Sequence, residues 1–265
     1  MKGIVGIKFD IDSQLKYFYV GELKVRRNLN VIAKTERGLE LGKIVTDIHQ
    51  IDNSKLHNEL MDILRIATKR DYNNYKKNKE LAHEALIKCR ELVTKMNLEM
   101  DIMESFFTLD KDHLIFHFYA DNRIDFRNLA KELAYIYKTR IELRQIGVRD
   151  KAQKVGGIGG CGQELCCSRF LNNFDSVTIS MAKDQNLSLN PTKINGVCGR
   201  LLCCLKYEED CYKSCKKILP KIGQTIETKN GIGKVISLNI LKQKYKIQLE
   251  NGNILEEEIS IGNNQ

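Results

Sequence analysis

The chain opens with short runs in which apolar and polar residues alternate, the two-residue period of strands that bury one face. Glycines at positions 21, 38 and 42 separate these runs and favour turns between them. The pattern predicts a small β unit over residues 1–50. Its expected strands are Gly3–Phe9, Leu15–Val20, Asn30–Ala33 and Leu39–Ile48.

A helical period replaces this alternation in the next segment. Asp52–Ser54 supplies capping side chains, and the apolar residues that follow are spaced three and four apart, as on one face of a helix. These residues are Leu56, Leu60, Ile63 and Ile66. The period resumes over residues 81–96, and the charged stretch Lys69–Lys79 indicates a break near Thr68, which could cap a second helix.

Strand-like runs then alternate with one further helix. The expected elements are, in order, a strand Leu98–Leu109, a turn Asp110–Asp112, a strand His113–Ala120, a helix Asp125–Tyr137 and a strand Thr139–Ile146. With the preceding helical tract they form an α-β-β-α-β domain over residues 51–150. We expect its helices to pack on one face of the sheet.

The amino-acid composition changes again after residue 150. Gly156–Gly160 contains four glycines, whose backbone can approach a bound group closely, and residues 151–219 hold eight of the nine cysteines. Residues 220–265 return to alternation, with Asn230-Gly231 and Asn251-Gly252 at hairpin positions, and predict a small SH3-like or KOW-like β barrel. The whole chain is therefore expected to be an α+β protein.

Composition narrows the function classes. The 265 residues carry a net charge of +9, which suits a polyanionic partner such as RNA or an acidic protein, or a merely solvated basic surface. The sequence has neither an apolar stretch long enough to span a bilayer nor a signal peptide, so we expect a cytoplasmic protein without a transmembrane segment. It also lacks a phosphate-binding loop and a nucleophile elbow, so we expect no enzymatic activity.

The most informative feature is an internal repeat of seven residues, CGxxLCC. Cys161–Cys167 reads CGQELCC, and Cys198–Cys204 reads CGRLLCC, 37 positions later. Clustered cysteines in a cytosolic chain indicate metal binding more often than disulfides. The candidate ligands are Cys161, Cys166, Cys167, Cys198, Cys203 and Cys204.

Spacing alone leaves the nature of this centre open. Zinc and iron–sulfur clusters both take cysteine thiolates, and buried structural thiols or redox-sensing thiols without metal remain alternatives. Cys89 lies on the apolar face of the predicted helix and is expected to be an inert core thiol. Cys211 and Cys215 are one helical turn apart and could be either ligands or incidental.

The cysteine segment carries a family resemblance. Met181–Ile194 reads MAKDQNLSLNPTKI and Cys198–Glu208 reads CGRLLCCLKYE, and together they resemble the RicT (YaaT) family. The α-β-β-α-β pattern is similar to the polymerase-suppressor C-terminal domain of that family, so the resemblance spans nearly the whole chain.

The resemblance implies a non-catalytic adaptor in a complex with two small helical proteins, RicA and RicF. Such a complex promotes RNase Y-dependent maturation of messenger RNA and supports sporulation, competence and biofilm development. The resemblance further implies an iron–sulfur cluster of the [4Fe–4S] type, bound by the matching cysteines of the twin repeats and completed by partner thiolates.

The alternative is a zinc-stabilised RNA-binding protein. In that case the basic terminal barrel would contact RNA directly, and the cysteine segment would be purely structural. The lysines that favour this alternative are Lys229, Lys234, Lys242, Lys244 and Lys246, which on alternating strands are also typical of a plain solvent face.

Overall fold

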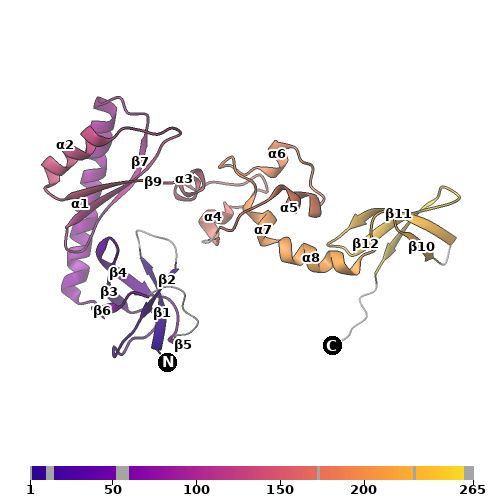
Figure 1. Ribbon diagram of the computed structural model, residues 1–265, viewed down its shortest axis with the longest axis horizontal. Coiled ribbons are helices and arrows are strands. Elements are labelled where there is room, and N and C mark those ends of the chain that lie inside the picture. The colour runs from indigo at the N-terminus through magenta and orange to yellow at the C-terminus, as the bar shows by residue number, and fades with distance from the viewer. Residues whose placement is uncertain (1, 10–14, 52–59, 172–173, 229–230, 260–265) are drawn as a thin grey trace. The chain divides into compact units, whose positions relative to one another are not determined.

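The computed structural model describes residues 2–9, 15–51, 60–171, 174–228 and 231–259 of the chain (Figure 1). It is a mixed α+β structure, as expected. The chain divides into two compact units, Met1–Val155 and Gly156–Gln265. The N-terminal sheet and the α-β-β-α-β elements lie in the first unit, and the cysteine segment and the terminal sheet lie in the second.

The first sheet has six strands in the order β2-β1-β4-β3-β6, with β5 pairing with β1. Its strands are β1 (Lys2–Phe9), β2 (Leu15–Tyr19), β3 (Asn30–Thr35), β4 (Gly38–Ile44), β5 (His49–Ile51) and β6 (Ile63–Ile66). All the pairings are antiparallel, and Ile7 of β1 lies opposite Ile44 of β4. Both residues are fully buried, but residues 4–7 of β1 and 31–33 of β3 are buried without a break, so these strands are covered on both faces and not only on the one that the alternation predicted.

The helix predicted after Asp52 is wrong where the structure describes it. Ile63–Ile66 is strand β6, which pairs with β3, and the Met61 carbonyl accepts a hydrogen bond from the Tyr19 amide. Ile63 is buried whereas Ile66 is exposed, so the three-residue spacing does not mark one buried face. The open edge of β3 is available for pairing, and two β-branched isoleucines suit a strand. Leu56 and the expected cap Asp52–Ser54 lie outside the described residues.

Helix α1 (Lys69–Lys95) begins where Thr68 was expected to cap it. The Thr68 side chain accepts a hydrogen bond from the Asp71 amide, and the Asp71 carboxylate accepts one in return from the Thr68 amide, which completes a capping box. The charged stretch Lys69–Lys79 is therefore the first part of one continuous helix.

The expected α-β-β-α-β order is confirmed for the elements that follow Thr68. They are α1, β7 (Asp101–Phe107), β8 (His113–Tyr119), α2 (Arg127–Tyr137) and β9 (Arg140–Gln145), with α3 (Val148–Val155) after them. Strand β8 pairs antiparallel with β7 and parallel with β9. Cys89 and Leu92 of α1, Phe116 of β8 and Leu129 of α2 belong to one buried core, so both helices cover the same face.

Short helices dominate the start of the second unit. They are α4 (Cys166–Arg169), α5 (Ile179–Asp184), α6 (Pro191–Ile194), α7 (Cys203–Tyr207) and α8 (Glu209–Ile218). Met181, Ala182, Ile194 and Leu205 form their buried core. The Gln185 side-chain amide donates a hydrogen bond of 2.6 Å to the Leu205 carbonyl and so links α5 to α7.

The terminal sheet contains four antiparallel strands in sequence order: β10 (Thr225–Thr228), β11 (Gly231–Asn239), β12 (Lys244–Leu249) and β13 (Ile254–Glu258). The Asn251-Gly252 hairpin is confirmed, because Gly252 has a φ of 81° in the turn between β12 and β13. Asn230 lies outside the described residues. The pairings link neighbouring strands in sequence, so closure into the expected barrel stays a prediction.

Candidate functional site

The first cysteine repeat folds as a compact turn, which we call knuckle 1 (residues 157–167). The Gly159 amide donates to the Gln163 carbonyl over 2.8 Å, and the Gly162 amide donates back to the Gly159 carbonyl over 2.9 Å. The Leu165 amide then donates to the Gly157 carbonyl over 3.1 Å. These three bonds hold Cys161 at the tip of the turn.

The second repeat forms the same turn, knuckle 2 (residues 194–204). The Gly196 amide donates to the Arg200 carbonyl over 2.8 Å, the Gly199 amide to the Gly196 carbonyl over 2.9 Å, and the Leu202 amide to the Ile194 carbonyl over 2.9 Å. Each donor and acceptor lies 37 positions after its counterpart in knuckle 1. The sequence repeat is therefore a structural repeat.

Glycine is needed at an equivalent position in the two knuckles. Gly162 and Gly199 have φ angles of 77° and 75°, in the left-handed region that costs other residues conformational energy. A Cβ at either position would meet no atom within 4 Å. The requirement therefore comes from the backbone, which must reverse directly after Cys161 and Cys198.

A short helix leaves each knuckle at the same point. Leu165 and Leu202 precede α4 and α7 with nearly identical dihedral angles, φ −54° and ψ 130° against φ −56° and ψ 128°. Cys166 and Cys203 are therefore first helical residues. The cysteines that follow them point about 100° further round the helix.

The two knuckles carry their helices into contact. The rings of Phe170 and Tyr207 lie 5.0 Å apart between centroids in an edge-to-face arrangement. These residues are also 37 positions apart, so equivalent positions of the two copies touch one another. Such a contact is typical of an approximate twofold relation, in which a patch packs against its own counterpart.

Three thiols from the two knuckles are electrostatic neighbours. Burial raises the pKa of Cys204 above its ordinary value of 9.0, and Cys166 and Cys161 raise it further. Burial likewise raises the pKa of Cys166, and Cys161 and Cys167 act in the same direction. Cys161 and Cys166 of knuckle 1 therefore lie close enough to Cys204 of knuckle 2 to raise its pKa.

The other candidate thiols differ in exposure. Cys161 is exposed, Cys167 is buried, and Cys198 and Cys203 are half-buried in knuckle 2. Within the part of the chain that the structure describes, no group of three or more His, Cys, Asp or Glu side chains is arranged to hold a metal ion. The candidate donors Cys161, Cys166 and Cys204 are thiols, which both zinc and iron–sulfur clusters bind as thiolates, and the charged groups beside them are Arg169 and Glu208.

The cysteines outside the repeats occupy two different environments. Cys89 lies on the buried face of α1, inside the core of the first unit. Burial raises its pKa to about 12, as expected of an inert core thiol. Cys211 and Cys215 face one another across one turn of α8, and the pKa of Cys211 is raised by Cys215 and by burial. Cys211 is exposed, so this pair is accessible from solvent.

Sequence reasoning missed the aromatic contact between the knuckles. Phe170 and Tyr207 lie three residues beyond the end of each heptapeptide. Extending the repeat at the same 37-residue offset would have shown aromatic residues at both positions. That signal could have indicated a contact between the copies.

Two of the lysines that favoured RNA binding are paired within the terminal sheet. Lys244 contacts Glu258 over 3.2 Å and Lys246 contacts Glu256 over 3.9 Å, each across neighbouring strands. These pairs reduce the positive charge that this part of the sheet offers to phosphates. Lys229 lies outside the described residues.

Comparison with known proteins gives matches over most of the chain. Residues 61–146 match the PSP1 C-terminal conserved region, and residues 176–219 match the third domain of PSP1-like proteins. The stage 0 sporulation protein YaaT of Bacillus subtilis is 47% identical over 251 residues, which cover 95% of this chain and 91% of that protein.

A more distant relative is an uncharacterized protein of Schizosaccharomyces pombe. It is 25% identical over 154 residues, which cover 47% of this chain and 21% of that protein. No solved structure matches the chain. Among the described residues, no helix is both long enough and apolar enough to cross a membrane.

Proposed function

Because the chain belongs to the YaaT (RicT) family, we propose that it is a non-catalytic iron–sulfur adaptor that supports sporulation, competence and biofilm development. In this proposal it joins RicA-like and RicF-like helical proteins in a complex that promotes RNase Y-dependent maturation of messenger RNA. The relative in Bacillus subtilis carries the name of a sporulation protein, which supports the coarser part of the proposal.

The observation that carries the proposal is the meeting of the two knuckles. Contact between Phe170 and Tyr207 joins their helices, and thiols from both copies are neighbours. A cluster spreads its irons over several ligands, so it suits thiolates drawn from separate turns. We propose Cys161, Cys166 and Cys204 as the main ligands that this chain contributes to the cluster.

The chain's own residues set the conditions for binding. A cysteine must lose its proton to bind iron, and burial opposes that loss at Cys166 and Cys204. Gly162 and Gly199 reverse the backbone so that Cys161 and Cys198 stand at the tips of their turns. When bound, the cluster would cross-link both knuckles to partner thiolates that complete its coordination.

The test is anaerobic co-purification with candidate RicA-like and RicF-like partners, followed by iron, sulfide and zinc quantification. We expect iron and sulfide together with absorbance near 400 nm, and loss of most of the iron in Cys161→Ser, Cys166→Ser and Cys204→Ser. Cys89→Ala is the matched control, because it removes a thiol from a core distant in sequence from the repeats, and it should keep its iron. A complex without iron or sulfide contradicts the proposal.

Zinc without sulfide would instead support the zinc-stabilised alternative. That alternative also requires direct RNA binding whose affinity falls steeply as salt rises. The pairing of Lys244 and Lys246 with glutamates weakens the case for RNA contact at this face. The metal content and the salt dependence separate the two functions.

A further inference from the structure

Helix α8, which leads from α7 to the terminal sheet (Figure 1), carries two cysteines that lie outside both knuckles. Cys211 and Cys215 are one turn apart on this helix. Cys211 is exposed and Cys215 is half-buried, so a solute can reach the pair. The charge of Cys215, burial and a side-chain hydrogen bond to Cys215 raise the pKa of Cys211, so the two sulfur atoms are neighbours.

Contacts at both ends of α8 fix the spacing of the two thiols. At the start of the helix the Glu209 carboxylate contacts Lys206 over 2.7 Å and Lys213 over 2.6 Å. At its end the Gln243 side-chain amide donates a 3.1 Å hydrogen bond to the Cys215 carbonyl. Gln243 is itself buried in the turn between β11 and β12, so the last turn of α8 is anchored to the terminal sheet.

This spacing suits a bridging ion better than a disulfide. Side chains four residues apart on a helix have Cβ atoms about 5–6 Å apart. A disulfide needs Cβ atoms about 3.5–4.5 Å apart, so its formation would deform a helix that is anchored at both ends. Two metal–sulfur bonds of about 2.3 Å span up to about 4.6 Å between the sulfur atoms, which an undeformed helix accommodates.

The donors on this helix favour a soft ion of low coordination number. Cys211 and Cys215 supply the sulfur donors of α8, and thiolates select copper(I), zinc and iron. Zinc and iron–sulfur centres take four ligands at each metal, whereas two thiolates satisfy copper(I). Glu208, whose charge also raises the pKa of Cys211, offers a hard oxygen that suits copper(I) poorly.

We propose that Cys211 and Cys215 form a binding site for copper(I), separate from the thiols of the knuckles. Each thiol would release its proton to solvent, and both thiolates would bind the ion through their Sγ atoms. Because binding releases two protons, the affinity should rise with pH. The site belongs to α8 alone, so it does not depend on the proposed iron–sulfur cluster.

The test uses the reduced full chain, without partners and without oxygen. Copper(I) is titrated in competition with bathocuproine disulfonate, a chromophoric chelator, and free thiols are then labelled with iodoacetamide. Cleavage after glutamate releases the fragment Asp210–Glu227, which contains both cysteines, so its mass reports how many carry a label. We expect copper(I) to slow labelling of this fragment at least about tenfold, because a bound sulfur is no longer a free nucleophile.

Variants of α8 assign the ion to this pair, since the knuckles also offer thiols. Cys211→Ser/Cys215→Ser should bind one copper(I) fewer than the parent chain. Cys215→Ser/Lys217→Cys keeps two thiols on α8 but moves them about 9 Å apart along the helix axis, so it should also lose that ion. Cys211→Ser alone changes an exposed residue and should lose the ion while the circular dichroism of the chain stays the same.

Four results would overturn the proposal. The first is equal copper content in the parent chain and the folded Cys211→Ser variant, and the second is full protection in Cys215→Ser/Lys217→Cys. The third is a fragment whose two cysteines are already joined as a disulfide in the reduced chain. The fourth is loss of iron from the anaerobic complex of Cys211→Ser/Cys215→Ser, which would make these cysteines cluster ligands instead.

Discussion

Burial separates the roles of the cysteines at the scale of single residues. Cys89 is enclosed by the core of the first unit, Cys161 is exposed at the tip of a turn, and Cys167 is buried behind it. The helical period already indicated that Cys89 is a core thiol. The sequence could not separate Cys166 from Cys167, because their difference in exposure depends on where α4 starts and on what packs against it.

Cys89 should make the first unit sensitive to alkali. Burial raises its pKa to about 12, so above pH 9 the unfolded thiol loses its proton while the native thiol keeps it. The native state then binds more protons, and the free energy of unfolding falls as pH rises, by at most about 1.4 kcal/mol per pH unit. We expect Cys89→Ala to remove this part of the slope, measured by urea unfolding between pH 8 and about 11. Equal slopes for the parent chain and the variant would contradict the assignment.

At the scale of elements, each knuckle depends on a backbone reversal at the glycine that follows Cys161 or Cys198. What the pattern could not supply was the set of three hydrogen bonds that makes the two turns equivalent. Those bonds reach back to Gly157 and Ile194, upstream of the heptapeptides. Gly159 and Gly196 already recur at the 37-residue offset, but only the structure shows that the equivalence extends to the Gly157 and Ile194 carbonyls.

Alanine at either reversing glycine should destabilise the second unit. Gly162→Ala and Gly199→Ala force a side chain into the left-handed region, at a cost of about 1–2 kcal/mol each. The two values should be similar, because space around both positions is open and the dihedral angles match. Gly160→Ala is the control, since its φ is not positive and nothing lies near its Cβ position. Thermal unfolding measures all three, and a Gly160 effect as large as the others would argue against backbone strain.

The start of α1 shows both the success and the failure of pattern reading. Thr68 was expected to cap a helix and does so, because a threonine followed three residues later by an acidic residue is a local signal. The residues before it were expected to be helical and instead form β6. Two turns of apolar spacing fit either structure, and the decision comes from β3, which is distant in sequence.

Asp71 links this helix start to the preceding strand. Its carboxylate accepts hydrogen bonds from Arg65, 2.5 and 2.9 Å long, and from Thr68, and the Arg65 guanidinium holds the pKa of Asp71 well below its usual range. Asp71→Asn should therefore lower the free energy of unfolding near pH 7 by about 1–2 kcal/mol.

The effect should disappear in acid. A depressed pKa stabilises the fold above the unfolded value near pH 4, and that contribution is lost as pH falls further. In urea unfolding, the difference between the parent chain and Asp71→Asn should shrink steadily as pH falls from 4 to 2. Asp125→Asn, which removes a carboxylate from the exposed pair with Arg127, is the control and should change stability much less. A difference that persists undiminished at low pH would count against this role.

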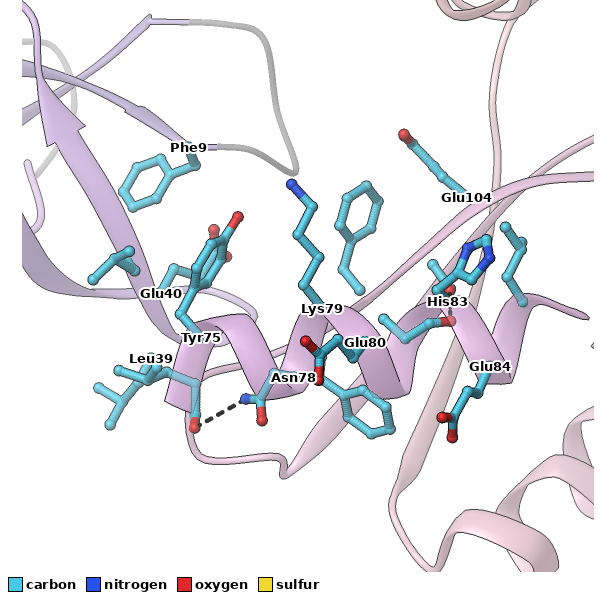
Figure 2. A pocket seen from close by; sticks show the side chains of 17 residues that line it. Phe9, Leu39, Glu40, Tyr75, Asn78, Lys79, Glu80, His83, Glu84 and Glu104 are labelled. Atoms are coloured by element: carbon cyan, nitrogen blue, oxygen red, sulfur yellow. Dashed lines mark hydrogen bonds between the residues drawn. The ribbon is translucent and has the colours of Figure 1, made fainter. Parts of the chain in front are cut away.

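At the scale of the whole molecule, the family and the α+β class could be predicted from motifs and alternation. The contact between the knuckles was not predicted, although aromatic residues recur at Phe170 and Tyr207 with the 37-residue offset, because a shared offset does not show that the two copies touch. A cavity lined by β1, β4, α1 and β7 (Figure 2) was equally hidden, because its walls depend on how these four elements pack.

The two units should respond differently to removal of the metal. In the described residues the first unit contains buried cores of twelve and ten residues, whereas the core around α5–α7 contains four, Met181, Ala182, Ile194 and Leu205. A segment that buries so little apolar surface gains more from ligand bonds that order its glycine-rich turns.

On the proposed function, anaerobic chelation of the purified complex should increase amide hydrogen exchange in residues 156–219 at least about tenfold, equivalent to about 1.4 kcal/mol. Exchange at Leu92 and Phe116 should not change, because both belong to a core of the first unit that is complete without metal. Uniform acceleration in both units would mean that the metal stabilises the molecule as a whole, and unchanged exchange in both would mean that the knuckles hold their structure without it.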